Sequence, residues 1–200
     1  MDEMDAIARL KQGDIHGLEY LVRTYQIKAL RTAYLIVRDY DLAEDVVQDA
    51  FLRAYQRIHQ FDVKRPFGPW FFKIVVNIAK QAAVRREREI AFDIVSANEE
   101  TALDKILADL KSPEAMVEQH DLQQMIWKAL GKLPPAQRTT IVERYYLGLR
   151  EKDIAARAGV PLGTIKWRLH TAHKQLCVWL GQLRPNIKFK QFKSEKEIEP

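Results

Sequence analysis

The chain has 200 residues, of which 47% are hydrophobic and 30% charged, and it carries a net charge of +5. This composition excludes a globally disordered chain and allows one large domain or two small ones. The single cysteine, Cys177, excludes an internal disulfide and is typical of a reducing compartment. Residues 1–14 are acidic and no stretch reaches the roughly 18 apolar residues of a membrane span, so we expect neither a signal peptide nor membrane insertion.

Apolar residues recur at helical spacing almost throughout, whereas strand signals are nearly absent. The sequence therefore predicts an all-α protein of two helical domains joined by a linker. In the N-terminal half, a helix near 7–10 ends at Gly13, helical stripes follow over 18–37, and a short turn is expected at 39–41. The next helix, about 42–59, has an apolar face made of Ala43, Val46, Val47, Ala50, Phe51, Ala54 and Ile58.

A loop at 61–69, with Gly68 and two prolines, separates that helix from another at about 70–86. Aromatic and basic residues alternate in this loop and the following helix. Cations that contact phosphates, together with aromatic rings that stack on unpaired bases, are typical of single-strand binding. At least two of the aromatic rings are nevertheless expected to lie in the core. Asn77 lies one turn beyond Lys73 and could bond a base edge. The aromatic residues are Phe61, Phe67, Trp70, Phe71 and Phe72, and the cations are Lys64, Arg65, Lys73, Lys80, Arg85 and Arg86.

The composition changes at about residue 90. The stretch 90–112 is acidic and weakly periodic, and Pro113 follows it. We interpret it as a linker between a module at 1–89 and a module at 113–183, and the pattern alone favours a solvated connector without a function of its own. Residues 184–200 have no convincing pattern and are expected to form a flexible tail.

The C-terminal module is predicted to be a four-helix unit, with helices at about 114–130 and from Leu133 to before Gly148, then two more around Gly159. The last two form a predicted helix-turn-helix, whose second helix would enter a DNA major groove. An ordinary helical hairpin with a solvated face is the alternative, but the charge and the aromatic residue on the exposed face favour DNA. That face carries Thr164, Lys166, Trp167, Arg168, His170, Thr171 and Lys174.

Three carboxylates, Asp41, Asp45 and Asp49, recur every four residues and share one helix face. A metal-dependent hydrolase or nuclease needs carboxylates that converge from several elements, and one stripe does not converge. We therefore expect a solvated acidic face or a docking face for a basic partner, and no catalytic residue.

His170, His173 and Cys177 are spaced at i, i+3 and i+7 on one predicted helix. Their atoms suit zinc, but three ligands from one straight helix rarely complete a tetrahedron and no fourth ligand is evident. We predict no metal site and no cofactor, and place Cys177 near the edge of the core.

The resemblance to a known family rests on three segments: LAEDVVQDAFLRAYQRIHQFD, RPFGPWFFKIVVNIAK and LPPAQRTTIVERYYLGLREKDIAARAGVPLGTIKWRLH. In this order and spacing they resemble the extracytoplasmic-function sigma factors of bacterial RNA polymerase, over about 18–180. The resemblance implies a region 2 at 1–89 that reads and melts the promoter −10 element, and a region 4 at 113–183 that reads the −35 element. The sequence departs from the usual family residues at Arg150, Trp167 and Thr171.

The resemblance also implies three sets of site residues. The helix matching 42–58 would dock on the polymerase β′ clamp through Asp45, Gln48, Asp49, Leu52 and Arg53. The loop and helix matching 64–80 would capture a flipped base and hold the melted −10 strand through Lys64, Arg65, Phe67, Trp70, Lys73, Asn77 and Lys80. The helix matching 163–174 would enter the −35 major groove and implicates Lys166, Trp167, Arg168, His170 and Thr171.

The function expected from this resemblance is initiation specificity without catalysis and without a small-molecule substrate. The implied partners are core RNA polymerase, through its β′ clamp and β flap, promoter DNA, and an anti-sigma protein of the kind that commonly holds family members inactive, often at the membrane. The implied location is the bacterial cytoplasm. The alternative is a stand-alone helix-turn-helix regulator, which would leave the acidic stripe and the aromatic–basic loop without a role.

Overall fold

The computed structural model describes residues 2–90 and 116–183, and every regular element in these two ranges is helical. The predicted all-α fold is therefore confirmed, whereas the predicted linker beyond Ile90 and the tail at 184–200 lie outside the described residues. The elements are α1 (Glu3–Lys11), α2 (His16–Val37), α3 (Tyr40–Gln56), a 3₁₀ turn η1 (Ile58–Gln60), α4 (Phe67–Ile90), α6 (Met116–Gly131), α7 (Pro135–Ile141), a π-helical turn η2 (Val142–Tyr146), α8 (Glu151–Ala158) and α9 (Leu162–Leu183).

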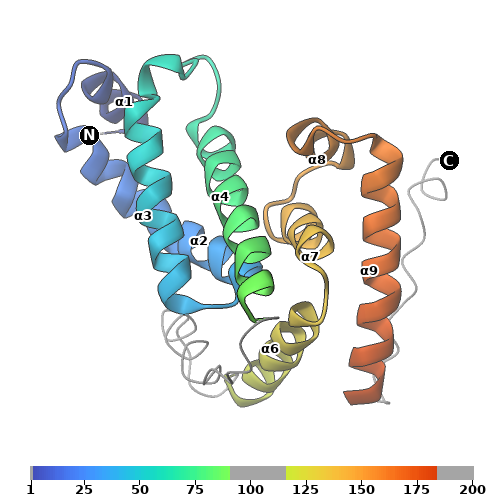
Figure 1. The fold of residues 1–200 in the computed structure, drawn as a ribbon. Helices are drawn as coiled ribbons and strands as arrows, with labels where there is room; N and C mark the ends of the chain where they lie inside the picture. Colours follow the sequence, from blue (N-terminus) through green and yellow to red (C-terminus); the bar gives the residue numbers. More distant parts are fainter. Residues whose placement is uncertain (1, 91–115, 184–200) are drawn as a thin grey trace, which may run out of the picture.

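The N-terminal unit packs α2, α3 and α4 against one another, with α1 across one end (Figure 1). All the residues predicted to form the apolar face of the helix at 42–59 are buried, so its helical period is confirmed. The helix is shorter than predicted, because α3 ends at Gln56 and Ile58 lies in η1. The predicted turn at 39–41 is shorter than expected, because the Asp39 carboxylate accepts from the Leu42 backbone N–H at 2.9 Å and starts α3 at Tyr40. Arg86 donates to the carbonyls of Val37 and Arg38 and thereby caps the end of α2.

The C-terminal unit consists of α6, α7 with η2, α8 and α9, as predicted. The turn between α8 and α9 begins at Gly159, whose φ of 64° lies in the left-handed region that suits glycine at a helix end. Arg150 occupies the N-cap of α8 without capping it, and its guanidinium instead pairs with Asp153 at 2.9 Å. The buried core of this unit contains Leu130, Leu133, Ile141, Ile154, Ala155, Ile165, Leu169 and Ala172.

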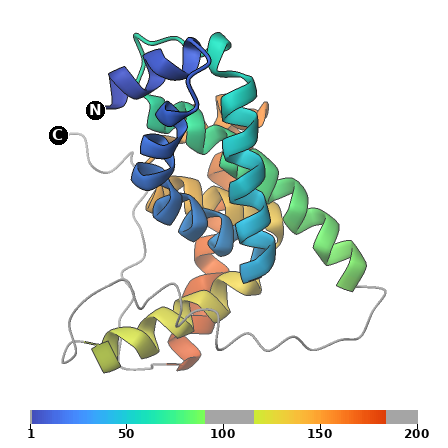
Figure 2. The same ribbon diagram turned by 90° about the vertical axis from the view of Figure 1, so that its left-hand side faces the viewer.

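The two units contact each other along a seam formed by α2 and α4 on one side and α6, α7 and η2 on the other. Figure 2, turned by 90°, shows α7 lying behind the N-terminal helices and α6 below them. Trp127 on α6 is 4% exposed and stacks on Tyr34 of α2 at 5.5 Å, while the Arg38 guanidinium covers it at 4.5 Å. Trp127 and Val142 thus belong to the same apolar cluster as the N-terminal helices.

Arg138 on α7 joins the two units through its guanidinium, although it is only 3% exposed. Its Nε donates to the Ile36 carbonyl at 2.8 Å, and Nη1 donates to the carbonyls of Leu133 and Gly131 at 3.1 and 3.3 Å. Its Nη2 donates to the Glu87 carboxylate at 3.3 Å. Burial lowers the pKa of Arg138, and the attraction of Glu87 opposes this shift.

No helix within the described ranges combines the length and the apolar character that crossing a bilayer requires.

We predict that Arg138→Ala lowers the free energy of unfolding by about 3–5 kcal/mol, because it leaves several buried carbonyls without a donor. Urea denaturation followed by circular dichroism measures this loss. The control is Arg23→Ala, whose guanidinium forms an exposed pair with Glu19, and we expect at most about 0.5 kcal/mol there. A loss below about 1 kcal/mol for Arg138→Ala would contradict the assigned role.

Candidate nucleic-acid interface

The outward face of α3 carries the acidic stripe predicted from the sequence. Asp45, Gln48 and Leu52 are exposed, and Leu52 has an unusually high exposed fraction of 53% for an apolar residue. Asp49 instead pairs with Arg53 one turn later, at 2.9 Å. The described residues contain no cluster of metal-ligating side chains. The stripe is therefore a mixed acidic and apolar surface suited to a protein partner.

The loop before α4 and the outer face of α4 present most of the residues predicted to hold a melted strand. Lys64 and Arg65 in the loop and Lys73 and Asn77 on the helix are all exposed, while Trp70 is partly buried.

Phe67 corrects the prediction for this loop. It is 1% exposed and its ring packs between Tyr25, at 5.4 Å, and Phe71, at 5.7 Å. Since α4 begins at Phe67, the loop is also shorter than expected. Phe67 supports the site from the core and does not face a base.

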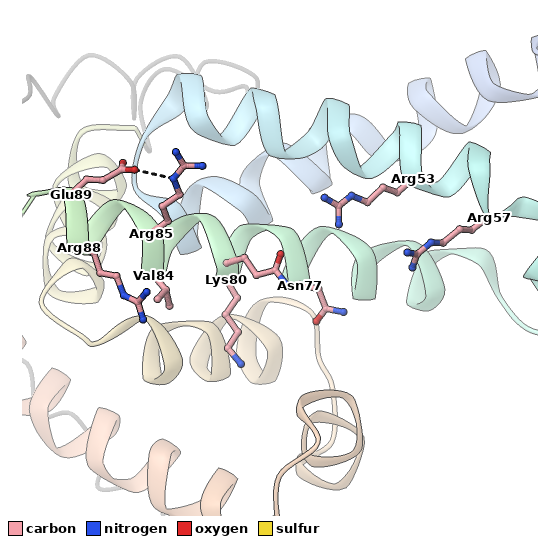
Figure 3. Close-up of a pocket in the computed structure, with 9 residues that line it drawn as sticks. Arg53, Arg57, Asn77, Lys80, Val84, Arg85, Arg88 and Glu89 are labelled. Carbon is pink, nitrogen blue, oxygen red and sulfur yellow. Dashed lines mark hydrogen bonds and ion pairs between the residues drawn. The ribbon is translucent and has the colours of Figure 1, made fainter.

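A groove of about 840 Å³, which we call the α3–α4 groove, runs between α3 and α4 (Figure 3). Asn77 and Lys80 were predicted as DNA contacts, and Arg53 as a polymerase contact. Arg85 was among the cations predicted to follow phosphates. The sequence interpretation missed Arg57, at the end of α3, and the remaining residues, whose spacing continues the face of Asn77 along α4. The groove is lined by Arg53, Arg57, Asn77, Lys80, Gln81, Val84, Arg85, Arg88 and Glu89.

The charge in the α3–α4 groove is strongly positive. Its one carboxylate, Glu89, is bonded by Arg85 at 2.9 Å, and Arg53 is held by Asp49. These exposed pairs are weak and exchangeable, so a polyanion could replace the carboxylates as partners of the arginines. The groove can therefore hold a row of phosphates, and two amide side chains within it can bond bases or sugars.

The second helix of the helix-turn-helix, α9, exposes Lys166, Trp167, His170 and Lys174 on one face, and Trp167 is 60% exposed. Thr164 and Thr171 border this face and are partly buried. The opposite face packs on the core of the C-terminal unit. This arrangement can place cations on phosphates and an indole on a thymine methyl in a major groove.

Arg168 does not lie on the exposed face of α9 with the other predicted DNA contacts, and it is partly buried. It lines a small cavity of about 20 Å³ at the seam between the two units. The cavity is lined by Val76, Asn77 and Lys80 of α4 together with Ala136, Thr139, Thr140, Glu143, Arg157, Ala158 and Arg168. Arg157 also reaches α4, donating to the Pro69 carbonyl at 2.7 Å.

Glu143, which the sequence interpretation did not single out, is the buried acid of this seam and is 5% exposed. Burial raises the pKa of its carboxyl to about 7, against the attraction of Arg157, Lys80 and Arg168. It lies in the π-helical turn η2, which is the kind of irregularity that often marks a functional position.

His173 lies on α9 and is partly buried. Its ring contacts Tyr145 at 5.2 Å, and burial together with His170 lowers its pKa. Cys177 is exposed and not at the edge of the core as expected.

Comparison with known proteins gives two family matches. The model of sigma-70 region 2 matches residues 21–89, and that of sigma-70 region 4 matches residues 123–176. Among curated proteins, the chain is 31% identical to the ECF RNA polymerase sigma factor SigW of Bacillus subtilis, over 88% of this chain and 96% of that protein. It is 30% identical to the ECF RNA polymerase sigma-E factor of Escherichia coli, over 85% and 90% of the two chains.

Solved structures agree in fold. The sigma factor RpoE of Bartonella quintana, in a co-crystal with the anti-sigma factor NepR, is 26% identical with a TM-score of 0.60, covering 81% of this chain and 96% of that one. CnrH, solved in complex with the cytosolic domain of CnrY, is 20% identical with the same TM-score of 0.60, covering 90% and 97%. The latter likeness concerns the fold alone.

We predict that Glu143 makes stability depend on pH. Because its pKa is raised to about 7 in the fold, its favourable contribution is complete below the unfolded value of 4.5 and is lost as pH rises through about 7. Glu143→Gln removes this dependence. Between pH 4.5 and pH 8 the free energy of unfolding of the native chain should therefore fall by roughly 3 kcal/mol more than that of the variant.

Urea titrations at the two pH values measure this difference. Glu151→Gln, which removes a carboxylate from the first turn of α8, outside the seam, is the control. Equal pH dependence in Glu143→Gln and the native chain would show that Glu143 is not the group responsible.

Proposed function

Because the chain belongs to the extracytoplasmic-function sigma factors of bacterial RNA polymerase, we propose that it directs core polymerase to promoters by reading −10 and −35 elements and begins the melting of the duplex. In this proposal residues 1–89 act as region 2, 90–112 as the linker and 113–183 as region 4. The polymerase forms the phosphodiester bonds, so the chain is not an enzyme and needs no cofactor or small substrate.

The observation that carries the proposal is the presence of a separate cationic surface on each unit. The α3–α4 groove lies in the part matched by region 2, and the exposed face of α9 lies in the part matched by region 4. A single DNA-binding surface would suffice for a stand-alone regulator, whereas two surfaces suit a factor that reads two elements. Linking the two modules then combines two modest affinities through effective concentration.

On the −10 side, we assign the melted strand to Lys64, Arg65, Trp70, Lys73, Asn77 and Lys80. The α3–α4 groove extends this surface, and its arginines would follow the phosphate backbone beyond the bases that are read. On the −35 side, Lys166, Trp167, His170 and Lys174 would contact the major groove, with Thr164 and Thr171 at its border. Phosphate contacts fix the register and base contacts set the sequence.

On the polymerase side, we assign the outer face of α3 to the β′ clamp and region 4 to the β flap. Exposed Leu52 would supply the apolar contact and Asp45 the charge that a basic partner attracts. Because a protein with this function acts on core polymerase, the location we propose for it is the bacterial cytoplasm. An anti-sigma protein is a further proposed partner, because the similar sigma factor of Bartonella quintana was solved with one.

The rival function is a stand-alone helix-turn-helix regulator, and reconstitution separates the two. The purified chain is mixed with core RNA polymerase, and the transcripts started from a genomic library are sequenced. We expect selective start sites preceded by common −10 and −35 elements. Binding to DNA without association with core polymerase, or initiation no more selective than that of core alone, would overturn the proposal.

We predict that Leu52→Ala and Asp45→Ala each weaken binding to core polymerase by about tenfold, which corresponds to roughly 1.4 kcal/mol. Fluorescence anisotropy with labelled chain measures the affinity. Glu19→Ala removes an exposed acid from α2, outside the acidic stripe, and should leave the affinity unchanged. An equal loss in Asp45→Ala and Glu19→Ala would indicate a general charge effect, and an unchanged affinity in Leu52→Ala would contradict the apolar contact.

We predict that the groove and α9 contribute differently to promoter binding by the complex. Arg57→Ala or Arg88→Ala should weaken binding to all promoter sequences alike and reduce the slope of log K against log salt by about 1. Lys166→Ala or Trp167→Ala should cost about 1–3 kcal/mol on a promoter with the −35 element, and little on one without it. Sequence-dependent losses for the groove variants would contradict the assignment.

A further inference from the structure

We propose that α1 positions the loop that receives the melted −10 strand, and that Lys11 and Glu3, at the two ends of α1, hold the two ends of this loop. The loop, which we call the capture loop, consists of residues 62–66 between η1 and α4 and carries two exposed cations. The proposal rests on the proposed function and adds positioning residues to its −10 surface. α1 itself lies outside residues 21–89, which the model of sigma-70 region 2 matches.

Lys11 holds the start of the capture loop. Its Nζ donates to the carbonyl of Phe61 at 2.7 Å. This carbonyl follows the 3₁₀ turn η1, and helix ends leave carbonyls without an intrahelical partner. The Phe61 ring is 3% exposed and packs against Phe67 at 5.6 Å and Trp70 at 5.1 Å. The charge-assisted bond and the buried ring together fix the point at which the chain leaves the core.

Glu3 holds the end of the capture loop through Tyr25. The Tyr25 hydroxyl donates to the Glu3 carboxylate and accepts from the backbone N–H of Gly68, in the first turn of α4. The first N–H groups of a helix have no intrahelical acceptor, so Tyr25 caps α4. An ideal Cβ on Gly68 would lie only 3.2 Å from the Tyr25 ring, and glycine therefore permits this close approach.

The body of α1 is fixed to the core, so it can serve as a rigid support between these two bonds. Ala6, Ile7 and Leu10 are at most 2% exposed. A side chain at Gly17 of α2 would collide with the Ala6 carbonyl, so the two helices cross in close contact. Figure 1 shows α1 beside the end of α3 from which the chain turns toward α4. One helix thus holds both ends of the loop.

Between its two ends the capture loop is shaped by Asp62. The Asp62 carboxylate accepts from the Lys64 backbone N–H at 3.0 Å, and its carbonyl accepts from the Arg65 N–H at 3.0 Å. This turn leaves the side chains of Lys64 and Arg65 exposed. Because these bonds are local to the loop, the direction in which the two cations point depends on how the ends of the loop are held.

A loop that is fixed at both ends improves selectivity as well as affinity. Ordering a mobile loop costs free energy each time a strand binds. A mobile loop also adapts to different bases, whereas a fixed loop presents its donors in one geometry and rejects bases that do not match. Loss of the Lys11 or Tyr25 bond should therefore reduce the preference for the correct base, and not only the yield of initiation.

Lys11 acts through the loop and not as a phosphate contact. Its ammonium group is engaged by the Phe61 carbonyl, and the first turn of α1 carries Glu3 and Asp5, which repel a polyanion. A direct phosphate contact contributes about 1 to the slope of log K against log salt. A positioning residue contributes nothing to this slope, so the salt dependence separates the two roles.

The test uses substitutions that remove one hydrogen bond while retaining most of the side chain. Lys11→Met and Tyr25→Phe each remove the bond to the loop, and Lys11→Arg restores a donor at the same position. Arg9→Met is the matched control, because it removes an exposed cation from the same helix without touching the loop. Circular dichroism checks that every variant is folded.

Hydrogen–deuterium exchange in the free chain measures how firmly the loop is held. We expect the amides of residues 61–68 to exchange about 3–10-fold faster in Lys11→Met and Tyr25→Phe than in the native chain. Lys11→Arg and Arg9→Met should exchange at the native rate. Native exchange rates in both Lys11→Met and Tyr25→Phe would overturn the proposal.

Selectivity is measured with core polymerase on a library in which the −10 element of one promoter, taken from the genomic reconstitution, is randomised. Sequencing the transcripts gives the base frequencies at each position. We expect the ratio of the preferred base to the others to fall about 3–10-fold at the most selective position in Lys11→Met and Tyr25→Phe. Arg9→Met should match the native chain, and Lys11→Arg should restore the preference. The salt slope should stay unchanged in Lys11→Met, whereas Arg57→Ala reduces it by about 1.

A lower yield of transcripts with native base frequencies in Lys11→Met and Tyr25→Phe would show a purely structural role and overturn the proposal. A salt slope reduced by about 1 in Lys11→Met would overturn it as well, because Lys11 would then contact phosphate directly. Failure of the proposed function would appear differently, as the absence of selective initiation by the native chain. The exchange rates of the free chain do not depend on that function.

Discussion

The two-unit architecture depends on a single buried cation. The guanidinium of Arg138 lies where the end of α2 meets the end of α6, and it donates to carbonyls of both units. Helix ends leave carbonyls without intrahelical partners, and burying them without donors is costly. By satisfying them, Arg138 allows two apolar surfaces to meet at Trp127, and the position of each cationic surface relative to the other unit follows from that meeting.

The structure gives the charged residues of the chain different roles that their sequence positions do not reveal. Arg86 caps α2, Arg138 joins the units, and Arg85 and Arg88 line the α3–α4 groove. From the sequence alone, all four arginines would be taken for exposed surface cations. The difference lies in burial and in the acceptors within reach, so the net charge of the chain overstates the positive charge that is free to meet a polyanion.

The helices and the helix-turn-helix could be predicted because they depend on local periods and on glycine and proline positions. The buried faces of α3 and α9 follow the helical repeat, and Gly159 marks the turn by its backbone conformation. The seam could not be predicted, because Trp127 and Glu143 acquire their partners from helices far away in the sequence. Phe67 was misjudged for the same reason: an aromatic residue beside basic ones has the same pattern whether it faces DNA or the core. Arg57 was missed because only the packing of α3 on α4 brings it to the groove.

The two tryptophans at opposite extremes of exposure, Trp127 at 4% and Trp167 at 60%, make the chain its own optical probe. An indole stacked between a phenol ring and a guanidinium emits at shorter wavelength than one in water, so the blue component of the emission spectrum reports on the meeting of the units. The red component comes mainly from exposed Trp167 on α9 and is open to quenching by iodide. Trp70 and Trp179 are partly buried and also emit. With these two indoles replaced by phenylalanine, movement of one unit against the other and coverage of α9 can be followed at separate wavelengths in protein without added dyes.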